Sequence, residues 1–243
     1  MSKLTCNAQV FDFNPNVFTD TNLTELGSKA VTQDGRAFRY VKAGTSDLVV
    51  GTLIDAPATD TSNFANMAVA ANAAAGSKTI SITSGVAVTA GKFVNGTVTI
   101  NAGAGLGYTY TIKSHNVLTV AGTLILTLDD SETVQIALTS AASKVTILIN
   151  PWNGVKIHAQ TEDSVPLGVA VAPIVAGQYG WIQTRGTVSC LGDGSAAAIG
   201  NLVAASTTTD GCITGGVATL ATVGIAIVAS VSTEKRPIFL TLD

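Results

Sequence analysis

The sequence is poor in charged residues. Asp, Glu, Lys and Arg make up 12% of its 243 residues, against roughly 25% in an average soluble domain. With four Glu and four Arg in the whole chain, surface helices held by ion pairs one turn apart are not expected. So little charge on a chain that is 47% apolar leaves broad neutral surfaces, which favour association with partners. The net charge of −3 provides no basic footprint, so we expect no nucleic-acid partner.

Cysteine and histidine are also scarce, and neither is spaced to bind a metal. Cys6, Cys190 and Cys212 are odd in number, and free thiols are expected because no secretory signal precedes them. The spacing alone does not decide whether Cys190 and Cys212 form a disulfide. His115 and His158 have no second histidine, cysteine or carboxylate at ligand spacing. The sequence therefore predicts no metal site and no cofactor.

Patterns that support catalysis are missing. The acidic clusters at 129–132 and 161–163 are typical of solvated loops, not of a paired-carboxylate cleft or a calcium loop. The glycine-rich segment 103–107 is not followed by the Lys-Ser/Thr pair and helix of a phosphate loop. Ser189-Cys190 has no base nearby in the sequence. Because enzymes need titratable groups with perturbed pKa values in a pocket, we expect a protein that is not an enzyme.

Two uncharged runs, at 165–184 and 211–233, approach the length of a membrane span. The first contains Pro166 and Pro173, and the second contains several Gly, Ser and Thr. Both runs favour uncharged β-strands over membrane helices, so no membrane partner is predicted.

What the sequence does contain is β-strand and turn chemistry, with 33 Thr and 24 Gly. Strands spaced about ten residues apart from 77 to 149 predict a small sandwich or barrel. Two further β-rich runs flank a turn at 176–178, and Asp34-Gly35 predicts a hairpin over 30–42. Segment 61–76 fits either a short helix with Ser62 as N-cap or a strand plus loop.

We therefore expect an all-β fold of β-sandwich or barrel modules with an extended N-terminal arm. The arm is residues 1–30. An enclosing β-domain combines 31–61 with 160–243, and an inserted β-domain covers 62–159.

Eight side chains are candidates for contacts with partners. The phenylalanines near the N-terminus either form a strand on the protein's own core or anchor an arm on a neighbouring subunit. The arginines of the predicted hairpin fit a solvated strand face or intersubunit ion pairs. The residues after the turn at 176–178 are expected in the core and in intersubunit contacts. The candidates are Phe11, Phe13, Phe18, Arg36, Arg39, Tyr179, Trp181 and Arg185.

Five segments carry a likeness to a known family: Asp-Gly-Arg-Ala-Phe-Arg-Tyr (34–40), Gly-Tyr-Thr-Tyr-Thr-Ile-Lys-Ser-His (107–115), Asn-Pro-Trp-Asn-Gly-Val (150–155), Gly-Gln-Tyr-Gly-Trp-Ile-Gln-Thr-Arg-Gly (177–186) and Arg-Pro-Ile-Phe-Leu (236–240). In these segments the chain resembles capsid decoration proteins of tailed bacteriophages, also called cement or head-stabilisation proteins, and related phage virion proteins. The chain is longer than the smallest decoration proteins, and the extra length fits an outward-projecting inserted module with the enclosing domain next to the capsid.

The resemblance implies a non-catalytic all-β protein that is made in the host cytoplasm and sits on the outer capsid surface of the virion. It would form a homotrimer, bind the major capsid protein and stabilise the shell by bridging capsomers. Two alternatives remain open. One is another virion β-structural protein, such as a tail-tube, fibre or receptor-binding subunit. The other is a carbohydrate-binding module in which Trp152, Tyr179 and Trp181 form a stacking platform, although such aromatics in β-proteins are more often buried.

Overall fold

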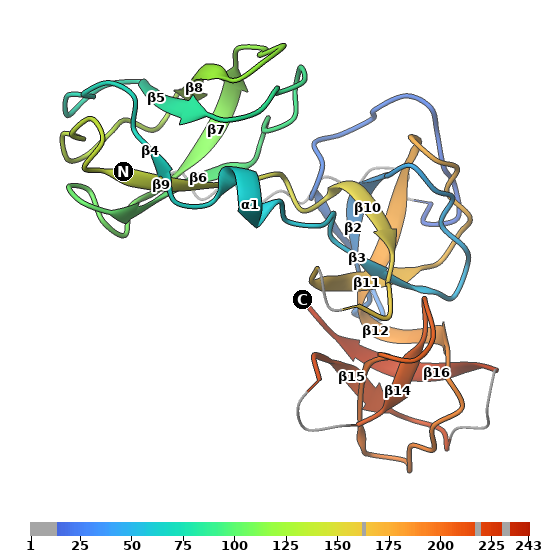
Figure 1. Cartoon of the computed structure of the whole chain (residues 1–243). Helices are drawn as coiled ribbons and strands as arrows, with labels where there is room; N and C mark the ends of the chain where they lie inside the picture. The colour runs from blue at the N-terminus through green and yellow to red at the C-terminus, as the bar shows by residue number, and fades with distance from the viewer. Residues whose placement is uncertain (1–13, 162–163, 217–219, 230–233) are drawn as a thin grey trace. The chain divides into compact units, whose positions relative to one another are not determined.

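The computed structural model describes residues 14–161, 164–216, 220–229 and 234–243 (Figure 1). In these residues sixteen strands and one four-residue helix are present, which confirms the all-β fold. The chain divides into two compact units. The enclosing unit combines residues 1–56 with 154–243, and the inserted unit is residues 57–153.

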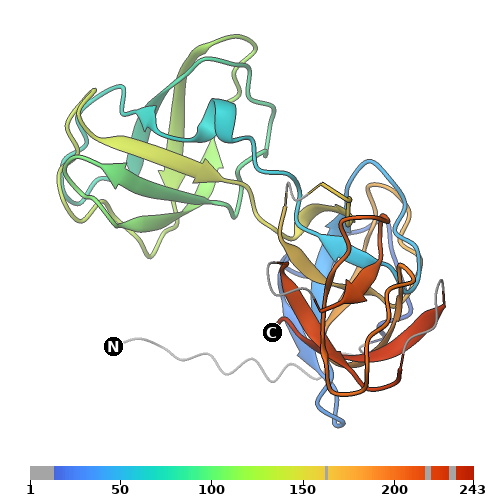
Figure 2. The same cartoon turned by 60° about the horizontal axis from the view of Figure 1, so that its bottom comes forward.

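The inserted unit is a six-stranded antiparallel sheet that closes on itself. Its strand order is β4-β9-β6-β7-β8-β5, and a bridge between Val69 and Ile82 joins the first strand to the last. Figures 1 and 2 show these strands, teal to yellow, round a common centre. The strands are β4 (Met67–Ala68), β5 (Thr79–Ser84), β6 (Thr97–Ala102), β7 (Thr109–His115), β8 (Gly122–Leu128) and β9 (Lys144–Leu148).

Alternation along the strands builds the core of this unit. In β5, Ile80 and Ile82 are fully buried, whereas Thr79 and Thr83 face outward. The same period of two places Val98 and Ile100 of β6 inside. Each such side chain contributes about 1.5–3 kcal/mol of hydrophobic stabilisation when fully buried. The unit therefore has a core of its own, assembled from residues between Phe64 and Ile149.

The enclosing unit is one ten-stranded sheet that curls into two barrels. In the first barrel the order is β2-β10-β3-β11-β12, and it closes because β12 also pairs with β2. The short strand β1 (Lys29–Val31) lies outside this ring and forms the predicted hairpin with β2. The members are β2 (Ala37–Ala43), β3 (Leu53–Asp55), β10 (Asn153–Ile157), β11 (Pro166–Ala170) and β12 (Tyr179–Leu191).

The second barrel continues from the same strand in the order β12-β16-β15-β13-β14. A parallel bridge between Gly192 and Ile213 returns its last strand to the end of β12. Figures 1 and 2 show these later strands in orange to red. They are β13 (Leu202–Ala205), β14 (Ile213–Gly215), β15 (Thr222–Ala226) and β16 (Lys235–Thr241).

Strand β12 is thus shared by the two barrels of the enclosing unit. Its first half pairs with β2 and β11, and its second half pairs with β16. The change of partner falls at Arg185, which pairs with Ala37 on one side and with Thr241 on the other. The next residue, Gly186, has φ of +87°, a left-handed conformation that side chains with a Cβ rarely adopt. This glycine lets one 13-residue strand serve two sheets.

Several predicted element boundaries were wrong. Residues 153–157 form β10, which pairs with β3, and from Gly154 onward the chain belongs to the enclosing unit and not to the inserted one. The runs 117–120 and 134–138 form no strand and make only isolated bridges, at Leu118 and Leu138. Segment 61–76 contains both alternatives, because α1 (Thr61–Phe64) precedes β4. Its N-cap is Asp60, not Ser62, since the Asp60 carboxylate accepts from the amide of Asn63.

Candidate functional site

An exposed apolar row crosses the outer face of the second barrel. In the register of the sheet, Leu202 of β13 lies opposite Ile225 of β15, which lies opposite Phe239 of β16. Leu202 is 53% exposed, Phe239 is 39% exposed, and Ile225 is partly exposed. Cross-strand neighbours on one face are in side-chain contact range. These three residues, called the apolar row below, therefore present one continuous hydrophobic strip to solvent.

The row arises because apolar residues occupy outward positions of otherwise alternating strands. In β16, Arg236, Ile238 and Leu240 point inward, which leaves Phe239 on the solvent side. Ile227 and Val228, just after β15, are exposed too. A large aromatic side chain facing water is unfavourable in an isolated protein and typical of an interface core.

Polar and basic side chains flank the apolar row. Thr187 of β12 faces Phe239, and exposed Arg185 lies two residues further along the same face, opposite Thr241. Lys235 lies at the other end of β16, opposite Leu191. The outer face is thus apolar in the middle with a cation toward each end of β16, an arrangement suited to a partner whose apolar patch has acidic residues at its edge.

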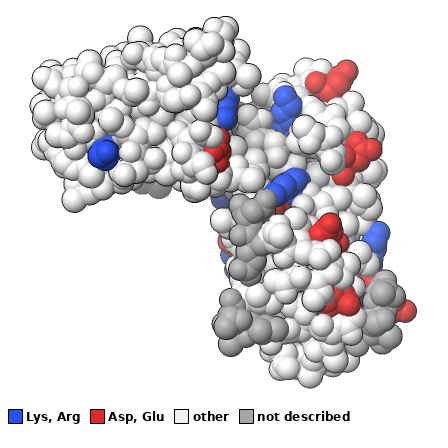
Figure 3. Space-filling model, in the orientation of Figure 1, with Lys and Arg blue, Asp and Glu red and all other residues white. Residues whose placement is uncertain are grey.

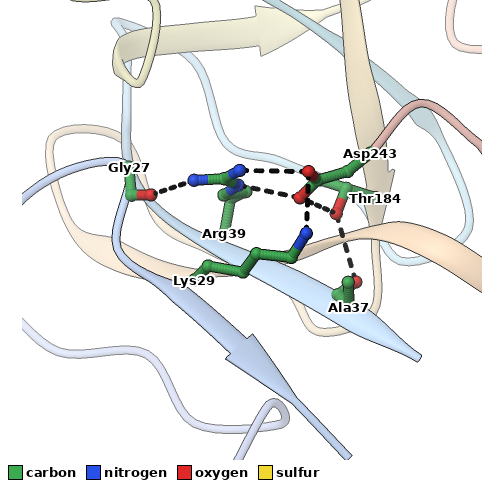
Figure 4. Close-up of polar contacts among 6 residues, drawn as sticks. All are labelled: Gly27, Lys29, Ala37, Arg39, Thr184 and Asp243. Atoms are coloured by element: carbon green, nitrogen blue, oxygen red, sulfur yellow. Dashed lines mark hydrogen bonds and ion pairs between the residues drawn. The ribbon is translucent and has the colours of Figure 1, made fainter. Parts of the chain in front are cut away.

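A charged cluster lies where the two barrels meet, close to the change of partner in β12 (Figure 4). Arg39 donates from Nε to Oδ2 of Asp243 and from Nη2 to Oδ1, at 2.9 and 3.0 Å, and Lys29 Nζ lies 2.9 Å from Oδ1. Thr184 Oγ1 lies 3.2 Å from Oδ2 of the same carboxylate. Hydrogen bonds from Arg39, helped by Lys29, lower the pKa of Asp243 to about 2 against the opposing effect of burial. The carboxylate is therefore ionised throughout the neutral range.

An aromatic cluster holds the start of the described chain. Tyr40 stacks on Tyr179 with ring centroids 6.1 Å apart and packs against Trp181 at 5.1 Å. Thr19 exchanges backbone hydrogen bonds with Tyr179, and the amide of Leu23 donates to the Tyr40 hydroxyl. From Thr19 onward, the predicted arm is therefore attached to the first barrel of its own chain.

The eight predicted contact residues lie in different places. Phe11 and Phe13 fall outside the described residues, and Phe18 is 40% exposed beside the Thr19 attachment. Arg36 pairs with Asp34 at 2.7 Å and lies over the Phe38 ring. For Arg39 we expected either a solvated strand face or an intersubunit ion pair. In the structure it forms an ion pair with Asp243 of the same chain. Tyr179 and Trp181 are half-buried on Tyr40, and Arg185 is exposed beside the apolar row.

Sequence reasoning missed the apolar row itself. The terminal strand was predicted, and alternation from buried Ile238 and Leu240 would have placed Phe239 outside. Nothing in the sequence indicated that Ile225 and Leu202 lie beside it, because that depends on the register of three strands.

One group of residues has the types found in a hydrolase triad but not its geometry. His158 Nδ1 lies 2.8 Å from Asp55 Oδ2, and the hydroxyl of Ser164 donates to that same carboxylate oxygen. The other ring nitrogen of His158 faces the carbonyl of Ser206 at 2.8 Å. A triad requires the serine on the histidine nitrogen opposite the carboxylate, so Ser164 is not activated as a nucleophile here.

The other candidates for chemistry have structural partners. His115 accepts from the amide of Phe93 through Nε2, and its Nδ1 lies 2.8 Å from the Asn116 carbonyl. Asp130 pairs with Lys113, and Glu132 accepts from the amide of Thr111. Within the described residues, no three His, Cys, Asp or Glu side chains are grouped to hold a metal ion. No helix in this part of the chain is long and apolar enough to cross a membrane.

Comparisons of the chain with family models, curated proteins and solved structures found no match. The function is therefore inferred from the residues of this chain.

Proposed function

We propose that the protein is a non-catalytic structural protein of a tailed-phage virion, which decorates the outer capsid and stabilises it by bridging capsomers. In this proposal the chain forms a homotrimer and its main partner is the major capsid protein. The single observation that carries the proposal is the apolar row of Leu202, Ile225 and Phe239, exposed on paired strands. The resemblance of the sequence to decoration proteins supplies the identity of the partner.

A surface of this kind suits a bridging role. Its side chains project from paired strands, so binding costs little conformational entropy. One row of three apolar residues forms a modest contact, but closed symmetry repeats it on every subunit, and linked contacts strengthen one another. A protein that works by many weak, repeated contacts needs an exposed apolar patch more than it needs a pocket.

The inserted unit supports the same proposal. Figure 3 shows that the visible face of this unit is almost free of charged side chains. Uncharged strand residues such as Thr97, Thr99 and Thr109 face outward on β6 and β7. A neutral, hydroxyl-rich surface is compatible with many copies packed closely on one particle, because it carries few like charges that would repel one another. In this proposal the inserted unit is the part that projects away from the shell.

The test is co-sedimentation of the purified chain with empty shells assembled from the major capsid protein encoded in the same genome. Saturable binding with a fixed number of copies per capsomer is expected, together with a trimer in multi-angle light scattering. A stable monomer that stays in the supernatant at saturating concentrations overturns the proposal. Binding to assembled tails but not to shells would favour the tail-tube or fibre alternative, and binding on a glycan array would favour the carbohydrate-binding alternative.

A further inference from the structure

His158 is a buried histidine whose two ring nitrogens both face acceptors. Its side chain is 3% exposed and follows β10 directly. Nδ1 lies 2.8 Å from a carboxylate oxygen of Asp55, and Nε2 lies 2.8 Å from the carbonyl oxygen of Ser206. A neutral imidazole has one N–H and can donate to only one of them, whereas an imidazolium donates to both. The geometry therefore fits the protonated ring.

The contacts of His158 join the two barrels of the enclosing unit. Asp55 is the last residue of β3 in the first barrel, and Ser206 follows β13 in the second. The hydroxyl of Ser206 continues the network, because it donates to Asp193 at 2.6 Å just beyond β12. One side chain thus connects segments of the two barrels.

Backbone hydrogen bonds place the turn at 206–212, which follows β13, against the first barrel. The amide of Gly211 donates to the carbonyl of His158 at 2.8 Å, and the amide of Leu53 donates to the carbonyl of Gly211 at 2.8 Å. Gly211 has φ of +70°, and a Cβ there would lie 3.1 Å from Thr52. The turn therefore packs closely against β3 and the end of β10.

The charges around His158 favour its protonated form. Among the described residues, the acidic groups near the ring are Asp55 on β3 and Asp210 in the turn before β14, with Asp193 one contact further away. The buried cation Arg236 of β16 donates to the carbonyls of Ser195 and Ile213, and within the described part of the chain it makes no hydrogen bond with the His158 ring. Burial alone would lower the pKa of His158, but the hydrogen bond and charge of Asp55, with smaller effects of Ser206 and Asp210, raise it above the usual value.

We propose that His158 forms a proton-dependent contact between the two barrels, which holds the turn at 206–212 against β3 while the imidazolium is present. Deprotonation would leave a carbonyl or a carboxylate facing a ring lone pair. It would also leave Asp55, 1% exposed, as a buried charge without a cation. One oxygen of that carboxylate, Oδ1, already makes no hydrogen bond within the described chain. The contact would therefore open as the proton is lost.

The direction of the pH effect follows from linkage. The pKa of His158 is raised on folding, so its contribution to stability is fully present below the unfolded value of about 6.5. That contribution is lost as the pH rises through the folded pKa. Mild acid should tighten the junction between the barrels, and alkaline pH should loosen it.

The first test is ring ¹⁵N NMR on the His115→Gln variant, which leaves one histidine in the chain. At pH 6.5 both ring nitrogens of His158 are expected to be protonated, and one of the two should lose its proton only as the pH rises further. Hydrogen exchange of amides 206–212 should accelerate at least tenfold beyond the intrinsic pH dependence across the same transition, while the inserted unit stays unchanged. A neutral ring at pH 6.5 overturns the proposal.

The second test compares His158→Gln with the parent and with His115→Gln. The parent and His115→Gln should share the same loss of melting temperature between pH 6 and 9, and His158→Gln should lack most of it. Equal pH profiles in all three proteins would contradict the proposal. Should His158→Gln fail to fold, the NMR and exchange experiments still decide the question.

Discussion

Asp243 and Arg39 lie 204 positions apart in the sequence and form a bidentate ion pair, with both nitrogen–oxygen distances close to 3 Å. Arg39 belongs to β2 of the first barrel, and Asp243 follows β16 of the second. Arg39 also donates to the carbonyl of Gly27 at 2.8 Å. The pair therefore fastens the last strand of one barrel to the first strands of the other.

Replacing Asp243 with Asn should lower the free energy of unfolding at pH 7 by about 1–2 kcal/mol, because the partly buried carboxylate loses its charge beside Arg39 and Lys29. The pKa of Asp243 is lowered to about 2, so its contribution is present above about 3.9 and is lost as the pH falls through 2. Urea unfolding at pH 7 and at pH 2 measures both effects.

The control is Asp130→Asn, which removes a solvent-exposed pair with Lys113. That variant should change stability by less than about 0.5 kcal/mol. Equal effects of the two substitutions would show that the Asp243 pair is no more than an ordinary surface contact.

Replacing Gly186 with Ala should destabilise the enclosing unit by about 1–3 kcal/mol. The left-handed φ is unfavourable for alanine, and the new Cβ would lie 2.9 Å from Cγ of Arg36. Gly177→Ala separates the two effects, since Gly177 has φ of +75° with open space around it. In thermal unfolding, Gly186→Ala should have a lower melting temperature than Gly177→Ala. Adding Arg36→Ala to Gly186→Ala should recover part of the difference. The reverse ranking would mean that β12 does not depend on this glycine.

Replacing Phe239 with Thr should weaken capsid binding at least tenfold, about 1.4 kcal/mol, because the centre of the apolar row is removed. Stability should change little, since Phe239 is partly exposed and threonine retains β-propensity. Co-sedimentation over a range of shell concentrations gives the affinity. The matched control is Ile125→Thr on β8, an exposed apolar residue of the inserted unit, which should bind as the parent does.

The thiols of Cys190 and Cys212 should not react in the folded protein. Both are free and buried, and burial raises the pKa of Cys190 to about 12. In a Cys6→Ser background, a thiol reagent at pH 8 should label neither cysteine until guanidinium is added, when both should react within minutes. Mass spectrometry counts the labels. Two labels on native protein would place the thiols at the surface, and none after denaturation would indicate a disulfide.

Residues 57–153, expressed alone, should fold cooperatively. The core of this unit consists only of its own side chains, from Phe64 to Ile149. The chain also enters and leaves it within a few residues of the enclosing unit's β3 and β10, which pair with each other. Circular dichroism and a single urea transition test this expectation. A molten, non-cooperative fragment would show that the inserted unit needs the enclosing one.

Sequence reasoning succeeded where a local pattern decides local structure. Alternation in Thr79-Ile80-Ser81-Ile82-Thr83 predicted β5, and Asp34-Gly35 predicted the turn between β1 and β2. Sequence reasoning failed where a run of apolar residues has no neighbouring strand to pair with along its length. The run 134–138 reads as a strand, yet within the described residues its backbone pairs only at its two ends, where Val134 bonds to Gly76 and Ser77 and Leu138 bridges Ala73. β-propensity describes the preference of a residue for extended backbone, whereas strand pairing depends on which segment of the chain lies beside it.

The candidate site was less predictable than the fold. Arg185, Tyr179 and Trp181 were selected from a conspicuous segment, and the structure places Arg185 beside the apolar row and the two aromatics against Tyr40. Leu202 and Ile225 carried no signal, because each looks like any other β-branched or aliphatic strand residue. Only strand register places them in line with Phe239.

The sequence by itself determined the class of the protein. Few charges, many threonines and glycines at the turns exclude helical packing and require strands, because β-branched side chains and period-two alternation suit a pleated sheet. Tertiary structure alone decided that β12 serves two barrels, that Arg39 meets Asp243, and that His158 lies between Asp55 and Ser206. These contacts join segments far apart in the chain, so they depend on how the sheets close, which no local pattern encodes.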